Sequence, residues 1–448
     1  MRKAILFALV FAWIGTAAAQ APTEAEQAVA RGGALVKEGK YDEAIAEFTT
    51  AIELKPDYAE AWHMRGYVRA VTRQYDEALR DIDRAIELSP PDTRLYFTRA
   101  RVRSEKADDD GAIADYTRIL DLAPTEVEAL VGRAGRYARK KDFEKAVRDF
   151  DRAIEIDPAN AEIYCARGRM FRIRNEFDKA MEDFNKALAL QPDLPWAVSG
   201  RAEVLARTGK YEQAIADYDE LIRQYPDDEG FRVGRGTAYA RMGQLEKALV
   251  DISRALDLNP RNSGAYFVRA GLYRLQGKDD LAIRDYTESL RLDPTGTGAW
   301  NQLGMIRFRQ GDYAKAVADF EKVPPGGAAR PYARVWIFIA EGRLGRDGKP
   351  ALAEFRKTAK DADWMTSVAR MFLAEVTPEQ CLAASADKDP KRDNEQKCEA
   401  YFYIGQFHLL RKDADAAREC FRKCVATGVT TFMEYDAAKA ELEKIEKK

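Results

Sequence analysis

Histidine and cysteine are scarce in this 448-residue chain, which contains only two histidines and five cysteines. His63 and His408 stand far apart in the sequence, so neither histidine-assisted nucleophilic catalysis nor a histidine metal site is supported. The Gly-x-Gly pieces at 234–236 and 296–298 follow no strand, and the acidic run 108–111 lacks the spaced ligands of a calcium loop. We therefore expect no catalytic residues, no cofactor and no metal, and a protein that is not an enzyme.

An excess of either charge is also missing. The 72 Lys and Arg residues oppose 74 Asp and Glu residues, for a formal net charge of −2, which gives no reason to expect a nucleic-acid partner. After the N-terminus, no apolar run is long enough to span a membrane. We therefore expect partners other than nucleic acid and no transmembrane span.

The first 19 residues have the pattern of a secretory signal peptide. Arg2 and Lys3 are followed by the apolar run Ala4–Ile14 and by three small residues, Ala17–Ala19. We expect cleavage after Ala19 and a periplasmic mature protein, with an uncleaved N-terminal anchor as the alternative. No cysteine lies near this site to accept a lipid.

The chain does contain a unit that recurs at a fixed interval. In the stretch 161–194, two apolar stripes with i, i+4, i+7 spacing predict two helices, separated at Asn175 and Glu176 and ended by Pro192. Helices this short cannot bury their apolar faces alone, so the units must stack on their neighbours. Three types of residue recur every 34 residues along the chain. They are prolines at 56, 90, 124, 158, 192, 226, 260 and 294, alanines from 44 to 316, and a large apolar residue four positions after each alanine.

This pattern resembles the tetratricopeptide repeat (TPR) family, whose 34-residue helix–turn–helix unit carries an aromatic, a small residue, Ala, an aromatic and a final Pro. The resemblance implies an all-α fold, a right-handed superhelical solenoid of such hairpins with a C-terminal capping helix. We expect an array of about nine repeats over 20–327, a degenerate helical segment with a charged loop (386–397) over 328–397, and a final repeat with the capping helix over 398–448.

One column departs from the usual TPR pattern. Arginines recur at the repeat interval from Arg31 to Arg269, and aspartates do so from Asp81 to Asp319 on the second helices. Antiparallel packing places each arginine opposite an aspartate, which favours an internal Arg–Asp ladder. A basic ladder that binds an anionic polymer is the alternative interpretation.

The C-terminal segment 401–445 is similar to the end of the NlpI family of envelope TPR proteins. The shared features are the FY-x-G opening at 402–405, the Ala/Phe second helix and the closing helix F-x-EY-x-A at 432–437. That family is lipid-anchored and acts as an adaptor for periplasmic proteases and cell-wall hydrolases. The resemblance implies a non-enzymatic periplasmic adaptor for envelope proteins; the alternative is a structural scaffold of an outer-membrane or exopolysaccharide export machinery.

In TPR arrays the first helices line the concave face, where peptides bind. By repeat position, we expect a groove of moderately basic character for acidic or mixed peptide segments; the alternatives are contact through the convex face or the C-terminal region. The groove residues are Tyr67, Arg94, Phe97, Arg101, Arg169, Arg172, Trp196, Arg207, Arg241 and Phe267.

Five cysteines in an exported protein suggest disulfides with one thiol left over. Cys398 begins the first helix of the last repeat and Cys424 ends the second, so antiparallel packing favours this pair. Cys381 pairs with Cys420, or both are free.

Overall fold

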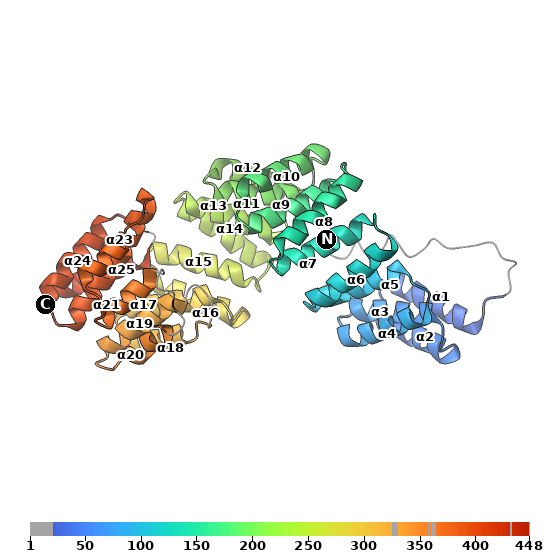
Figure 1. Cartoon of the computed structure of the whole chain (residues 1–448), viewed down its shortest axis with the longest axis horizontal. Coiled ribbons are helices and arrows are strands. Elements are labelled where there is room, and N and C mark those ends of the chain that lie inside the picture. Colours follow the sequence, from blue (N-terminus) through green and yellow to red (C-terminus); the bar gives the residue numbers. More distant parts are fainter. Residues whose placement is uncertain (1–20, 325–329, 357–358, 360–363, 431, 448) are drawn as a thin grey trace. The chain divides into compact units, whose positions relative to one another are not determined.

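The computed structural model describes residues 21–324, 330–356, 359, 364–430 and 432–447, so the predicted signal peptide lies outside the described residues. These described residues form helices joined by turns, with no strand among them (Figure 1), which confirms the all-α prediction. The chain divides into two compact units, 1–204 and 205–448, and each is described by itself.

The first unit is a succession of helical hairpins in which an odd-numbered first helix pairs with the even-numbered second helix that follows. Each second helix also packs against the first helix of the next hairpin. The helices are α1 (Glu24–Lys37), α2 (Tyr41–Leu54), α3 (Ala59–Val71), α4 (Tyr75–Leu88), α5 (Thr93–Glu105), α6 (Asp109–Leu122), α7 (Val127–Arg139), α8 (Phe143–Ile156), α9 (Ala161–Ile173), α10 (Phe177–Leu190) and α11 (Pro195–Arg207), which crosses the boundary.

The second unit continues the alternation and ends with less regular helices. Its helices are α12 (Tyr211–Gln224), α13 (Glu229–Arg241), α14 (Leu245–Leu258), α15 (Ser263–Leu275), α16 (Asp279–Leu292), α17 (Thr297–Gln310), α18 (Tyr313–Glu321), α19 (Arg330–Arg343), α20 (Lys349–Arg356), α21 (Trp364–Phe372), α22 (Pro378–Ala384), α23 (Pro390–Leu410), α24 (Ala414–Ala426) and α25 (Met433–Glu446).

The hairpins of the array turn on a residue in the left-handed backbone region. In the repeat 161–194 this residue is Asn175, with φ of 59°, and in the next repeat it is Gly209, with φ of 81°. Asparagine and glycine tolerate this conformation better than other residues, which explains why the helical pattern breaks there. The second helix α10 then ends at Leu190, shortly before Pro192.

Aromatic side chains fill the space between helices, and glycines make room for them. Phe184 on α10 is fully buried, and its ring lies against Gly168 on α9 and Gly200 on α11. A Cβ atom at Gly200 would lie 2.4 Å from Cζ of Phe184, closer than two carbon atoms can pack. Glycine at 200 is therefore required by this close approach.

The C-terminal helices differ in one place from the sequence prediction. The charged stretch 386–397 was expected to be a loop, but α23 begins at Pro390 and runs through it, so that prediction is wrong from Pro390 on. The Asp389 side chain accepts a hydrogen bond from the Arg392 amide at 2.9 Å, and Pro390 occupies the first turn, where its missing N–H costs nothing. Lys397 and Asp393, one turn apart, form an ion pair of 2.7 Å along the exposed helix.

The final hairpin of α23 and α24 restores the repeat pattern. Phe421 is fully buried, and its ring lies against Gly405. Trp336 of α19 stacks on Phe402 with ring centroids 5.0 Å apart, so α19 and α23 share an aromatic core. In the part of the chain that the structure describes, no helix is long and apolar enough to cross a bilayer.

Candidate functional site

The arginine column forms the internal ladder that the sequence favours. In α9, Nε and Nη2 of Arg167 donate to the two carboxylate oxygens of Asp183 at 2.9 and 2.8 Å, and Nη1 donates to Asp151 of α8 at 2.5 Å. The guanidinium therefore joins its own hairpin to the preceding one. The same fork to the aspartate of the following second helix recurs at Arg65, Arg99, Arg133, Arg235 and Arg269.

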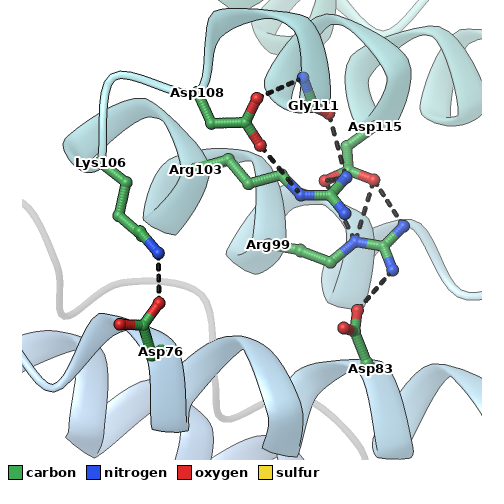
Figure 2. Close-up of polar contacts among 8 residues, drawn as sticks. All are labelled: Asp76, Asp83, Arg99, Arg103, Lys106, Asp108, Gly111 and Asp115. Atoms are coloured by element: carbon green, nitrogen blue, oxygen red, sulfur yellow. Dashed lines mark hydrogen bonds and ion pairs between the residues drawn. The ribbon is translucent and has the colours of Figure 1, made fainter.

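Figure 2 shows the ladder around Arg99. Its guanidinium lies between Asp115 of α6, at 2.6 Å, and Asp83 of α4, at 2.7 Å, while Arg103 donates to Asp115 from the next turn of α5 at 2.9 Å. Asp115 is 1% exposed, so both of its oxygens are used inside the protein. These arginines have their charge neutralised internally, which excludes the basic-ladder interpretation for the column at Arg65 to Arg167.

The electrostatics of the ladder agree with its geometry. Hydrogen bonds to Asp251 raise the pKa of Arg235, and those to Asp285 raise the pKa of Arg269. Burial raises the pKa of Asp183, and the two hydrogen bonds from Arg167 oppose that shift. Both oxygens of Asp183 accept from one guanidinium, which is the bidentate geometry of an arginine–carboxylate pair.

The predicted groove residues of the first unit lie on first helices, but they differ in how accessible they are. Arg101 on α5 and Arg169 on α9 are exposed, and the Trp196 side chain on α11 is 57% exposed. The half-buried Arg172 forms an ion pair with Glu203. The others are Tyr67 on α3, which is half-buried, and two residues of α5: Arg94, whose Nη2 lies 2.8 Å from Asp92, and Phe97, whose ring packs on Tyr116.

In the second unit, Arg207 at the end of α11 and Arg241 at the end of α13 are exposed. Phe267 on α15 is 37% exposed and packs edge-on against Tyr286, with ring centroids 5.5 Å apart. The aromatic groove residues Phe97 and Phe267 thus contact buried tyrosines of the second helices and are partly core residues.

The C-terminal helix α25 occupies the first-helix side of the last hairpins. Arg274 of α15 donates to Asp436 of α25 at 2.6 Å, and Arg343 of α19 donates to Glu441 at 2.8 Å. Arg309 of α17 lies 3.6 Å from the same Asp436. Sequence reasoning predicted α25 as a cap, but it missed these partners because they are 98 to 162 residues apart in the chain.

The arginines that hold α25 belong to the repeat pattern. Arg309 follows Arg241 by two repeats and Arg207 by three, and Arg274 follows Arg172 by three repeats. Repeat positions assigned to the groove from the sequence are therefore the ones that contact an acidic helix of the same chain. This regularity was the signal in the sequence that could have identified the contact.

One of the two histidines, His63, is buried on α3. Burial lowers the pKa of His63 to about 4, and its Nε2 lies 3.0 Å from Oγ1 of Thr98, so the imidazole is neutral at pH 7. Within the described ranges, no group of three or more His, Cys, Asp or Glu side chains could hold a metal ion.

The preferred cysteine pair is close in space. Sγ of Cys398 lies 3.5 Å from Sγ of Cys424, and both side chains are fully buried, as free thiols. The two side chains meet as expected, but Cys398 lies inside α23 and does not begin it, because that helix starts at Pro390. The disulfide itself stays a prediction.

Comparison with known proteins identifies the repeat. A model described as "TPR repeat" matches residues 32–70, 135–169 and 168–209, and models described as "Tetratricopeptide repeat" match residues 59–92, 199–252, 233–297 and 280–334. Together these matches cover more than half of the chain.

A curated relative matches part of the chain at low sequence identity. The lipoprotein NlpI homolog of Haemophilus influenzae is 26% identical over 145 residues, which are 32% of this chain and 46% of that protein. The chain thus spans about half the length of this curated relative.

Solved structures of repeat proteins were compared with the chain as well. A tetratricopeptide repeat protein from Parabacteroides merdae has a TM-score of 0.50 at 19% identity, over 58% of this chain and 99% of that chain. The APC/C hetero-tetramer Cut9–Hcn1 is similar at a TM-score of 0.43 and 14% identity, over 94% of this chain and 97% of that chain. With the hairpins and their regular register, the repeat matches show that this chain belongs to the tetratricopeptide repeat family.

Proposed function

We propose that this chain is a non-enzymatic scaffold of the cell envelope, exported to the periplasm, that binds acidic segments of other proteins along its first helices. One observation carries the proposal: α25, an acidic amphipathic helix, is held on the first-helix side of α15, α17 and α19 through Asp436 and Glu441. The chain's own helix therefore serves as a template for a ligand of this surface.

The same chemistry is present elsewhere in the array. Arg207 and Arg241 stand at the repeat position of Arg309, and both are exposed. In the first unit, Arg101 and Arg169 are exposed. Arginine suits a carboxylate because its planar fork can donate two parallel hydrogen bonds. A partner that presents Asp and Glu on one helix face, as α25 does, fits these positions.

The resemblance to NlpI proteins suggests which partners to test. Following it, we propose envelope proteases or cell-wall hydrolases as the proteins that the scaffold brings together. Cleavage after Ala19 would release a mature chain that begins at Gln20. Mass spectrometry of the protein from the periplasmic fraction tests this part, and a full-length N-terminus in the membrane fraction would contradict it.

The binding proposal is tested with a defined probe, a fluorescent peptide of the α25 sequence. Fluorescence anisotropy measures its affinity for the full chain and for the triple variant Arg101→Glu, Arg169→Glu, Arg172→Glu. We expect the variant to bind at least about tenfold more weakly, and added salt to weaken binding to the unmodified chain.

The matched control changes three exposed arginines on second helices of the same unit: Arg84→Glu, Arg118→Glu and Arg152→Glu. This control has the same net charge as the test variant, and we expect it to bind like the unmodified chain. Equal losses in both triple variants would mean that net charge alone attracts the peptide, and the proposal would fail.

A further inference from the structure

A pocket of about 410 Å³ lies among α17, α19, α23 and α25 in the second unit. This is the size of pockets that bind small molecules or one large side chain. Aromatic and carboxylate side chains line it together: Tyr332 and Trp336 of α19, Phe432 before α25, Glu399 of α23 and Glu434 of α25. The repeat pattern requires neither of the two carboxylates, and the proposed scaffold function does not use them.

The two carboxylates are buried without a cation beside them. Glu399 is 9% exposed and Glu434 is 5% exposed. Each accepts a hydrogen bond from a neutral donor: Nε1 of Trp364 donates to Glu399 at 2.7 Å, and the Tyr403 hydroxyl donates to Glu434 at 3.0 Å. Among the ion pairs of the described residues, none includes either carboxylate. Buried carboxylates with neutral partners alone are costly, so such groups are found mainly where a ligand or a function requires them.

The pKa values of Glu399 and Glu434 reflect the cost of burying a negative charge without a cation. Burial and the neighbouring Glu434 raise the pKa of Glu399 to about 8, and burial raises the pKa of Glu434. The positive charge of Arg274, which does not line the pocket, opposes this rise in the pKa of Glu434. A positive charge inside the pocket would restore the ionised carboxylates at neutral pH, because an opposite charge within a few ångströms favours the charged form.

The other polar atoms of the pocket also accept hydrogen bonds. Oδ1 of Asn301 and Oε1 of Gln302, both on α17, are buried and have no hydrogen-bond partner. Buried polar atoms are almost always satisfied in folded proteins, so these two oxygens point to donors supplied by a ligand. Acceptors and aromatic rings in one lining match a cationic group that carries several N–H donors.

We propose that this pocket is a binding site for an organic cation, a guanidinium or primary ammonium group on a short alkyl stem. The carboxylates pair with the charge, the amide oxygens accept its remaining N–H groups, and Trp336 and Phe432 cover the stem. The cation is either a free amine or guanidine, or the arginine or lysine side chain of a bound protein. The two sources share this chemistry and differ only in whether a peptide backbone is attached.

Isothermal titration calorimetry on the full chain tests the site with propylguanidinium and with propylurea, its uncharged isostere. A second arm uses the pentapeptide Ala-Ala-Arg-Ala-Ala and the same peptide with citrulline in place of arginine. We expect at least one charged probe to bind at least about tenfold more tightly than its neutral counterpart. Binding of propylguanidinium identifies a free cation as sufficient, whereas binding of the arginine peptide alone identifies a protein side chain.

Substitutions of the two carboxylates test whether the charged probe binds in this pocket. Glu399→Gln and Glu434→Gln keep the shape and a hydrogen-bonding amide but remove the charge, and we expect each to weaken the charged probe at least about tenfold. Glu443→Gln, an exposed position of α25, is the control and should bind normally. Thermal midpoints of all variants establish that they fold.

Three results would overturn the site: no charged probe binds, charged and neutral probes bind equally, or the folded double variant Glu399→Gln, Glu434→Gln retains full affinity. These outcomes are independent of whether the first helices bind acidic segments, since no arginine of the peptide experiment lines the pocket.

Discussion

Arg167 and Asp183 form a bidentate pair between the two helices of one hairpin, and Asp183 is 3% exposed. Asp183→Asn keeps one acceptor oxygen but removes the buried countercharge of the half-buried guanidinium, which is left with the exposed Asp151 alone. We expect this change to lower the free energy of unfolding by roughly 3 kcal/mol, because removing one partner of a buried pair is far costlier than replacing both. Urea denaturation of the full chain measures the change.

Asp178→Asn on the same helix is the control, because Asp178 is exposed. It should change the free energy of unfolding by no more than about 0.5 kcal/mol. If the two variants unfolded alike, the ladder would contribute nothing specific, and the arginines would be available to a ligand.

Two glycines of first helices should respond in opposite directions to alanine. At Gly200 an added Cβ meets the buried Phe184 ring at 2.4 Å, so Gly200→Ala should destabilise the chain by about 1–3 kcal/mol. At Gly135 of α7 such a Cβ meets nothing within 4 Å beyond the backbone of its own helix, so Gly135→Ala should stabilise the chain by about 0.5–1 kcal/mol through helix propensity. Thermal unfolding of both variants checks the signs, and adding Phe184→Leu to Gly200→Ala should recover part of the loss.

Glu399 should make stability depend on pH. Its pKa is raised from 4.5 to about 8 by burial and by Glu434, so the native state holds the proton more tightly than the unfolded chain does. The stability from this group is therefore complete below pH 4.5 and is lost as the pH rises through 8.

Glu399→Gln cannot ionise, so it should gain stability relative to the unmodified chain as the pH rises, by up to about 1.4 kcal/mol per pH unit. Unfolding free energies between about pH 5 and pH 9 measure this difference. The exposed control Glu443→Gln should show a constant difference. A constant difference for Glu399→Gln as well would mean that its carboxyl is not buried in the native state.

Cys398 and Cys424 should oxidise as a pair. Their Sγ atoms are 3.5 Å apart, so a small shift brings them to bonding distance. Thiol titration in denaturant of the protein purified from the periplasm, with and without reductant, should show two fewer thiols before reduction. Cys398→Ser should abolish that difference, whereas five titratable thiols in the unreduced exported protein would refute the pairing.

The periodic part of this fold could be predicted from the sequence because its contacts are local. Each arginine of the ladder pairs with an aspartate on the next helix of its own hairpin, and Phe184 packs on glycines of the two adjoining first helices, Gly168 and Gly200. Such contacts lie within one repeat or between neighbours, so a column in the sequence is sufficient to locate them.

The less regular features could not be predicted in the same way. The start of α23 has a local signal, Asp389 before Pro390, but the absence of apolar residues over 390–397 favoured a loop. The docking of α25 on Arg274 and Arg343 and the pocket between Asn301 and Glu399 join segments that are several repeats apart in the chain. The repeat positions of Arg274 and Arg343 mark the surface that is contacted, but no periodicity in the chain identifies α25 or the pocket lining as the segment that meets it, because this depends on where the array stops.

Arg99, Arg167 and Arg235 each reach one aspartate ahead and one behind at equal distances along the chain, and this has an evolutionary consequence. Arg167 meets Asp183 ahead and Asp151 behind, and Arg235 does the same with Asp251 and Asp219. A duplicated or deleted block of one whole repeat therefore carries a complete set of countercharges across its new junction. The gene can therefore gain or lose whole repeats while every ladder arginine keeps an aspartate partner. An insertion of any other length would shift the arginines out of register with their aspartates.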